Sequence, residues 1–169
     1  MKNIVLIGMP GCGKSTLGVL LAKHLGFDFV DTDIVIQNLA GEVLYKILEK
    51  EGVNGLLDRE QKAILSLDLE GTSKVISTGG SAVLRRESME YLKRNGVCLY
   101  LKLSYEQIQK RINNRQTRGI AAENHETLLD IYNFRIPFYE KYADITVDCE
   151  KNSLQENLEK IINKLSQIR

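Results

Sequence analysis

Residues 8–16 read GMPGCGKST and directly follow the apolar run IVLI at residues 4–7. The stretch has the pattern of a phosphate-binding loop, which is a glycine, four residues of any kind and then Gly-Lys-Ser. The next residues, 17–25, carry apolar side chains at helical spacing. A strand, this loop and a helix in direct succession predict an α/β domain with the loop at the end of its first strand.

Each part of the loop suits the binding of nucleotide phosphates. Glycines let successive backbone N–H groups turn toward an anion, and a helix that begins near Gly13 adds the positive end of its dipole. The Lys14 ammonium group can reach terminal phosphates, and the Ser15 hydroxyl group can coordinate Mg²⁺. We therefore expect ATP and Mg²⁺ to bind here, with a purely structural glycine-rich turn as the alternative. The expected ATP-binding residues of the loop are Gly11, Cys12, Gly13, Lys14, Ser15 and Thr16.

Length and charge limit the function classes. A chain of 169 residues is large enough for a substantial core, and we expect a single domain over 1–169. Its 23 basic and 22 acidic residues give a net charge of +1, so no overall field attracts nucleic acid or a membrane surface. We therefore expect a small-molecule acceptor, no nucleic-acid partner and no membrane partner. The sequence leaves the oligomeric state open and favours a monomer.

Cysteine usage and the N-terminus predict a cytoplasmic protein. The odd, widely spaced set Cys12, Cys98 and Cys149 forms neither a disulfide framework nor a zinc motif. The N-terminal apolar run is too short for a secretion signal, and no run has the length of a transmembrane helix. Cys12 either fills a variable loop position, which is the favoured interpretation, or has a thiol activated by the helix N-terminus and Lys14.

Short apolar runs alternate with segments of helical spacing along the chain. Runs that are apolar on both faces, such as VCLYL at 97–101, are typical of buried parallel strands. We therefore expect a five-stranded parallel sheet with helices on both faces. Two capping boxes, Ser104 with Gln107 and Ser153 with Glu156, predict where two helices begin. The five predicted strands are 4–7, 27–30, 74–77, 97–103 and 145–147.

The polar segment 113–126 is the predicted lid. It has no clear strand or helix pattern, and Arg115 and Arg118 lie near its start. Long polar loops in compact domains often cover a binding site. A plain surface loop is the alternative.

Two carboxylates, Asp31 and Asp33, follow the second predicted strand. The carboxyl ends of neighbouring parallel strands border one crevice, and residues i and i+2 of an extended chain point the same way. Both side chains can therefore reach the phosphate site, one near Mg²⁺ and one near the hydroxyl group of an acceptor. The alternative is an aspartate that caps a helix starting after Val35, and Asp33 could serve both purposes.

The third predicted strand ends in STGGS at 77–81, without the acidic residue that often follows such a strand. The pair Gly79 and Gly80 lets the backbone approach a ligand closely. An ordinary strand-to-helix turn explains the pair equally well.

With these motifs, the chain resembles the shikimate kinase family of phosphate-binding-loop kinases from Met1 to the last predicted helix. The family's motifs are the loop, Asp-x-Asp after the second strand, Phe-Arg-x-x-Glu, a Gly-Gly-Gly turn, an arginine in a lid and Arg-x-Pro-x-Tyr. The last motif is complete as RIPFY at 135–139. The resemblance implies the strand order 2-3-1-4-5, acceptor-binding helices over 34–62, ATP and Mg²⁺ as cofactors, and shikimate as the acceptor.

The resemblance also implies roles for individual residues. Asp31 lies near the Mg²⁺ ion that Ser15 coordinates, Asp33 contacts the acceptor hydroxyl, and Arg111 packs against adenine. Arg118 is the lid arginine, which stabilises the phosphoryl group in transfer. The implied catalytic residues are Lys14, Asp33 and Arg118, and the implied acceptor-binding residues are Asp33, Leu57, Gly79, Gly80 and Arg135, of which Arg135 binds the carboxylate.

Three positions depart from the family's motifs. Leu57 replaces an arginine that, in the family, grips the carboxylate of shikimate together with the counterpart of Arg135. Ser81 replaces the third glycine, and Gly119 replaces the usual proline after the lid arginine. Loss of one charge-assisted partner of a carboxylate costs about 1.5–3 kcal/mol, which is about 10- to 100-fold in binding.

We therefore expect an ATP-dependent kinase that phosphorylates a hydroxyl group of a small metabolite, with shikimate as the first choice of acceptor. One alternative is a related kinase that acts on another polyol, sugar acid or hydroxy amino acid. Another is a nucleotide-binding protein without kinase activity.

Overall fold

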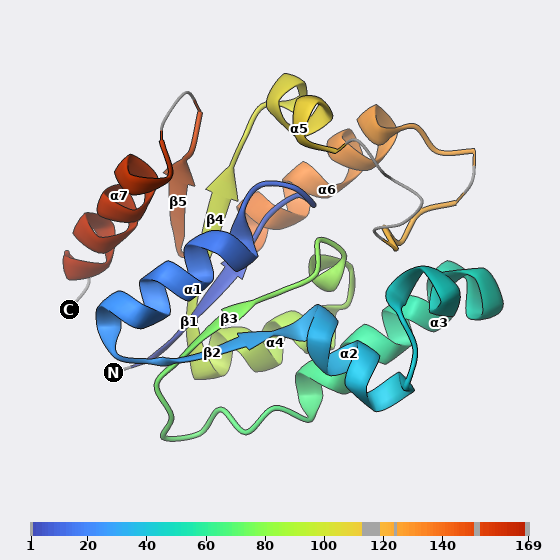
Figure 1. Cartoon of the computed structure of the whole chain (residues 1–169), viewed down its shortest axis with the longest axis horizontal. Coiled ribbons are helices and arrows are strands. Elements are labelled where there is room, and N and C mark those ends of the chain that lie inside the picture. The colour runs from blue at the N-terminus through green and yellow to red at the C-terminus, as the bar shows by residue number, and fades with distance from the viewer. Residues whose placement is uncertain (1, 113–118, 124, 151–152, 168–169) are drawn as a thin grey trace.

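A fully parallel five-stranded sheet with the order β2-β3-β1-β4-β5 forms the centre of the computed structural model (Figure 1). The structure describes residues 2–112, 119–123, 125–150 and 153–167. Both the predicted fold class and the predicted strand order are confirmed. The strands are β1 (Asn3–Ile7), β2 (Asp28–Asp31), β3 (Lys74–Ser77), β4 (Gly96–Lys102) and β5 (Ile145–Asp148).

The core lies along β1, which is the middle strand. β3 and β4 flank it in parallel register, with Leu6 opposite Ser77 on one side and Leu99 on the other. Because helices cover both faces of the sheet, both sets of alternating side chains are buried, and Val5, Leu6 and Ile7 are each 0% exposed. This explains why residues 4–7, IVLI, are all apolar instead of alternating between apolar and polar side chains.

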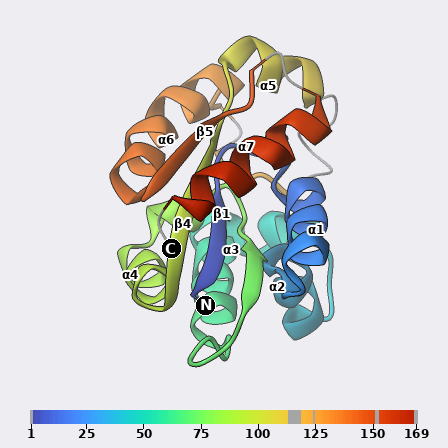
Figure 2. The same ribbon diagram turned by 90° about the vertical axis from the view of Figure 1, so that its left-hand side faces the viewer.

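Helices form a layer on each face of the sheet (Figures 1 and 2). On one face α1 and α7 pack against each other, and on the other α4 and α6 contact β4. No helix in the described part of the chain is both long and apolar enough to cross a membrane. The helical elements are α1 (Lys14–Leu25), α2 (Thr32–Ala40), α3 (Leu44–Leu65), the 3₁₀ turn η1 (Ala82–Leu84), α4 (Arg86–Asn95), α5 (Tyr105–Arg111), α6 (Leu128–Tyr142) and α7 (Leu154–Ser166).

α2 and α3 pack against each other beside the sheet (Figure 1). The backbone of α3 departs from helical geometry at Gly52, whose φ of 70° favours glycine, so the chain bends there. A second hydrophobic cluster, separate from the main core, fills the space between the two helices; it includes Ile36, Ile47, Leu56 and Leu57.

The two predicted capping boxes have different outcomes. The Ser153–Glu156 box at α7 is complete. At α5 the Ser104 hydroxyl accepts a hydrogen bond from the backbone N–H of Gln107. The second bond of the box, from the Ser104 N–H to the Gln107 side chain, is replaced. The Ser104 N–H donates instead to the carboxylate of Glu150, at 3.0 Å. The loop after β5 brings this charged acceptor to the helix start, and a carboxylate is a stronger acceptor than an amide.

Candidate active site

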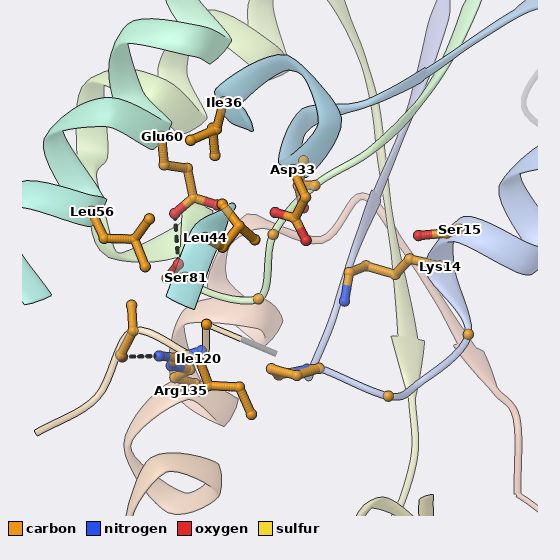
Figure 3. A pocket seen from close by; sticks show the side chains of 18 of the residues that line it. Lys14, Ser15, Asp33, Ile36, Leu44, Leu56, Glu60, Ser81, Ile120 and Arg135 are labelled. Atoms are coloured by element: carbon orange, nitrogen blue, oxygen red, sulfur yellow. Dashed lines mark hydrogen bonds between the residues drawn. The ribbon is translucent and has the colours of Figure 1, made fainter. Parts of the chain in front are cut away.

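The carboxyl ends of three neighbouring strands border one cavity of about 360 Å³ (Figure 3). The phosphate-binding loop follows β1, Asp31 ends β2, and the glycine turn follows β3. The parallel register places Leu6 and Asp31 on either side of Ser77, so the three segments leave the sheet at the same edge. The cavity therefore contains the loop, the acidic segment and the glycine turn that the sequence singled out.

The loop holds Lys14 in the cavity wall. The Lys14 side chain extends back along the loop, and its Nζ donates to the carbonyl oxygens of Gly8 and Met9 at 2.8 and 2.9 Å. Gly13, the residue before α1, has a φ of 100°, which explains the glycine at that position. The helix N-terminus and the ammonium group thus lie together, as the motif predicts.

The backbone N–H of Cys12 is not free to bind phosphate, as the expected cradle requires. Its backbone N–H donates to the carbonyl oxygen of Met9 at 3.2 Å, so this donor is already used inside the loop. Its side chain is 1% exposed, and a Cβ on Gly8 would lie 2.9 Å from the Cys12 sulfur. The thiol therefore fills space behind the loop, which supports the simpler of the two interpretations of this cysteine.

Ser15 and Asp31 meet as the metal assignment requires. The Ser15 hydroxyl donates to Asp31 Oδ2 at 2.6 Å and lies 3.2 Å from the Ser77 hydroxyl. Mg²⁺ in kinases is held by one or two protein oxygen ligands together with phosphate oxygens and water, so this exposed hydroxyl–carboxylate pair fits the ion. Ser77 was not among the predicted site residues; it occupies the strand end where an acidic residue was missing.

The two aspartates do not lie in one extended segment, which corrects the sequence interpretation. β2 ends at Asp31 and α2 begins at Thr32, so Asp33 lies in the first helical turn. Asp31 rather than Asp33 caps this helix, because Asp31 Oδ1 accepts from the Asp33 N–H at 3.0 Å. Both carboxylates still reach the site, since the helix starts at the sheet edge.

The carboxyl group of Asp33 has a perturbed acidity. Burial is the main cause that raises the pKa of Asp33 from 3.8 to about 6, and the negative charge of Asp31 adds to it. The positive charge of Lys14 lowers this pKa. A carboxylate with a pKa near neutrality is well matched to accepting a proton from a reacting group.

The glycine turn after β3 is packed on both sides. A Cβ on Gly80 would lie 2.6 Å from the ring of Pro10, and one on Gly79 would lie 2.2 Å from Glu60 Oε1. The Gly80 carbonyl oxygen accepts from the Tyr139 hydroxyl at 2.5 Å. Glycine is therefore needed for close approach to the phosphate-binding loop and to α3, beyond the demands of an ordinary turn.

Arg135 lies at the far end of the cavity from the helix start of α1 (Figure 3). Its side chain is 2% exposed, and Nη2 donates to the carbonyl oxygen of Ala121 at 2.5 Å. A buried arginine with its guanidinium group at a cavity wall can bind a carboxylate in two parallel hydrogen bonds. Ile120 lies beside it, and the cavity wall also includes the apolar side chains of Ile36, Leu44 and Leu56.

Leu57 is not where the acceptor-site prediction put it. Leu56 lines the cavity, whereas Leu57 is 7% exposed and packs in the second hydrophobic cluster. Consecutive helical residues point in directions about 100° apart, so only one of the pair can face the cavity. Leu57 thus contributes to the packing behind the wall.

Glu60 and Ser81 complete the cavity, and neither was among the predicted site residues. Glu60 is 2% exposed and accepts a hydrogen bond from the Ser81 hydroxyl to Oε2 at 2.6 Å. Burial is the main cause that raises the pKa of Glu60 from 4.5 to about 7, and Asp33 adds to it. The Ser81 hydrogen bond, Arg135 and Lys14 lower it. In the sequence, Glu60 stands at the glutamate of the family's Phe-Arg-x-x-Glu motif, which reads LLDRE at 56–60, but its burial depends on the tertiary packing.

The predicted lid is described only in part. Arg118 and Arg115 lie outside the described residues. Of the remainder, Gly119, Ile120 and Ala121 line the cavity. Arg111 ends α5, and its Cβ would lie 3.7 Å from a Cβ on Gly11, so it lies beside the phosphate-binding loop.

The start of α1 with Lys14 and Ser15 lines the same cavity as the Asp33 carboxyl group and the buried Arg135, and Asp31 accepts a hydrogen bond from Ser15. This fold and this arrangement define the chain as a phosphate-binding-loop kinase of small molecules. A family model described as Shikimate kinase matches residues 10–166. The chain belongs to the shikimate kinase family and is an ATP-dependent, Mg²⁺-using phosphotransferase.

Curated relatives match over nearly their whole length. A shikimate kinase of Thermodesulfovibrio yellowstonii is 41% identical over 170 residues, which cover 99% of this chain and 97% of the relative. One from Haemophilus influenzae is 36% identical over 166 residues, covering 96% and 91%.

Solved structures agree in fold. Shikimate kinase from Acinetobacter baumannii in complex with shikimate has a TM-score of 0.91 at 29% identity, covering 100% of this chain and 95% of that one. A gluconokinase from Sinorhizobium meliloti has a TM-score of 0.57 at 16% identity, covering 99% of this chain and 93% of that one. The second similarity concerns the fold alone.

Proposed function

We propose that the chain transfers the γ-phosphoryl group of ATP to a hydroxyl group of shikimate, forming shikimate 3-phosphate. The observation that carries the proposal is one cavity with Lys14 and Ser15 at one end and Asp33 and Arg135 at the other. Shikimate presents both groups that this second end suits, a hydroxyl group for phosphorylation and a carboxylate. Family membership and the shikimate complex of the Acinetobacter baumannii enzyme support the same acceptor.

The nucleotide side of the reaction is assigned to the loop and its neighbours. Backbone N–H groups of residues 11–16 hold the phosphates, with the exception of Cys12, whose N–H is used within the loop. Ser15 and Asp31 hold Mg²⁺, which neutralises charge on the phosphate oxygens when bound. Lys14 leaves the loop carbonyls for the terminal phosphate, and Arg111 contacts the adenine side.

Asp33 is assigned to the acceptor hydroxyl. It accepts the proton as the hydroxyl oxygen attacks, and its raised pKa makes it a better base than an exposed aspartate at neutral pH. Gly79 and Gly80 form the adjacent wall of backbone. The attack therefore takes place between the start of α1 and the start of α2.

Arg135 is assigned to the carboxylate of the acceptor. The apolar wall beside it, with Leu56 in front and Leu57 behind, supplies no second positive charge from that helix. Arg118 stays a predicted catalytic residue of the lid. We further propose a cytoplasmic location, where ATP is abundant, and a monomer.

The test is ADP release by purified protein with Mg²⁺ and ATP, with shikimate and with a panel of hydroxylated acids, polyols and hydroxy amino acids. We expect turnover that depends on shikimate. The Lys14→Met variant should stay folded and lose turnover by at least about 100-fold, because it removes charge from the developing phosphoryl anion. Turnover with another acceptor and none with shikimate would assign a different substrate, and ATP binding without any turnover would leave a nucleotide-binding protein.

A further inference from the structure

The buried carboxyl group of Glu60 is held by one hydroxyl group. Glu60 projects from α3 into the cavity wall, and its Oε2 accepts from the Ser81 hydroxyl at 2.6 Å (Figure 3). Among the described residues, Ser81 is the one hydrogen-bond donor to this carboxyl group. A buried carboxylate requires such a partner, because without one its charge is costly in an apolar environment.

The other oxygen, Oε1, borders the space assigned to the acceptor. A Cβ on Gly79 would lie 2.2 Å from Glu60 Oε1 and 3.0 Å from Asp33 Oδ1. The two carboxyl groups thus flank the same glycine from α3 and α2, and both point into the cavity (Figure 3). A molecule whose hydroxyl group reaches Asp33 lies next to Glu60 as well.

The charges that face Glu60 come from three other elements. Asp33 on α2 opposes ionisation of Glu60, whereas Lys14 on α1 and Arg135 on α6 favour it. Neither cation donates a hydrogen bond to it. On α3 itself, residue 57 lies one helical turn before Glu60, but it is a leucine and supplies no donor.

We propose that Ser81 is a positioning residue for acceptor binding: its hydroxyl group fixes one oxygen of Glu60, so that the other accepts a hydrogen bond from a hydroxyl group of the acceptor. The proposal rests on the proposed kinase function and deepens it. It adds a second recognised hydroxyl group to the one that is phosphorylated. It also places the carboxylate of the acceptor away from Glu60, at the Arg135 end, since two carboxylates side by side repel each other.

The test compares three serine variants by steady-state kinetics. Ser81→Ala should raise the KM for shikimate about 10-fold and leave the KM for ATP within about 2-fold, because one charge-assisted hydrogen bond of the acceptor wall is lost. Ser81→Thr keeps the hydroxyl group and should keep most of the affinity. Ser88→Ala is the matched control, since Ser88 is buried in α4 outside the cavity and its hydroxyl group has no hydrogen-bond partner among the residues that the structure describes.

Two kinetic outcomes would overturn the proposal. One is a Ser81→Ala variant with an unchanged KM for shikimate. The other is a Ser81→Thr variant as impaired as the alanine variant, which would mean that Ser81 only fills space in the turn. If Ser81→Ala does not fold, Ser81→Cys keeps the volume with a weaker donor, and its KM for shikimate should rise while its KM for ATP stays unchanged; an unchanged KM for shikimate would again reject the proposal.

A second measurement needs no acceptor. The Glu60 carboxyl carbon, followed by NMR through a pH titration of the free protein, should titrate at a higher pKa in Ser81→Ala than in the wild type, because Ser81 stabilises the ionised form. An unchanged pKa would reject the positioning role. If the wild type does not phosphorylate shikimate, the proposed function fails, and this titration still decides whether Ser81 holds Glu60.

Discussion

Four charged side chains with different surroundings meet at the active site. Lys14 and Arg135 are the positive groups and Asp33 and Glu60 the negative ones, and all four line the same cavity. Burial separates the acidities of the two carboxyl groups from those of ordinary surface acids. At the residue scale, function therefore depends on which of these groups carries a proton.

Asp33→Asn tests the proposed base. The amide cannot accept the proton, so we expect kcat to fall by about 100-fold or more while ATP binding, measured by calorimetry, stays the same. In the wild type, kcat/KM should rise with pH through a value near 6, because the raised pKa of Asp33 keeps it protonated below that. Asp33 would lose its assignment if the variant kept its kcat, or if only its folded fraction fell.

Leu57→Arg tests the departure from the family motif. Leu57 itself does not line the cavity, but residues 57 and 60 lie three apart on α3, so the longer side chain of an arginine at 57 can pair with Glu60 at the cavity wall and add a second positive charge there. We expect the KM for shikimate to fall by roughly 10-fold. The control Leu57→Met keeps the volume and should leave that KM unchanged.

The stability of both Leu57 variants is measured by thermal unfolding alongside these assays, because Leu57 is buried in the second hydrophobic cluster. A stable Leu57→Arg protein with an unchanged or higher KM for shikimate would mean that the apolar wall suits the acceptor as it is.

At the element scale, the wall of the cavity is assembled from segments far apart in the chain. The stretch 119–121 reaches the first turn of α3, and its Ala121 carbonyl oxygen holds the guanidinium group of Arg135. α6 in turn supplies Tyr139, which bonds the glycine turn. Acceptor binding should therefore depend on how closely these segments approach.

Gly119→Ala tests this approach. Gly119 has a φ of +58°, and a Cβ there would lie 2.5 Å from the Leu44 Cβ, so the alanine should displace 119–121 from α3. We expect the KM for shikimate to rise several-fold, with a smaller change in the KM for ATP. Gly71→Ala is the matched control, because its φ of +64° is equally strained but its Cβ would meet nothing within 4 Å. Equal kinetic effects of the two variants would argue against a role of this contact.

On the scale of the whole molecule, the buried acid links function to stability. Folding raises the pKa of Glu60 from 4.5 to about 7, so between these values the folded protein binds more protons than the unfolded chain. The free energy of unfolding must then fall as pH rises through this window. The penalty is absent below pH 4.5 and fully present above pH 7.

Glu60→Gln should remove this dependence. Relative to the wild type, the variant should gain stability between pH 4.5 and pH 8, by an amount on the order of 3 kcal/mol, while its KM for shikimate rises. Urea unfolding at several pH values measures the first effect. Parallel pH dependence of the two proteins would show that Glu60 does not ionise in this range. A gain in stability with a loss of function is typical of a residue kept for its role in a site.

Much of the architecture could be read from local patterns. The strand–loop–helix start identified the phosphate site, and apolar runs located the five strands of a parallel sheet. These features are local because backbone geometry and burial on both faces of a strand act within a few residues. The strand order came from the resemblance to the family, since periodicity alone does not say which strands are neighbours.

Tertiary structure decided the details of the acceptor end. Helix phase put Leu56 rather than Leu57 at the cavity wall, and the end of β2 made Asp31 the helix cap. In the sequence Glu60 is marked only by its place in the family motif, and only packing of α3 against the glycine turn buries it beside Ser81. The chain by itself thus determined its fold class and its phosphate chemistry. The acidity and partners of its buried charges depend on desolvation by distant segments, which exists only once the chain has folded.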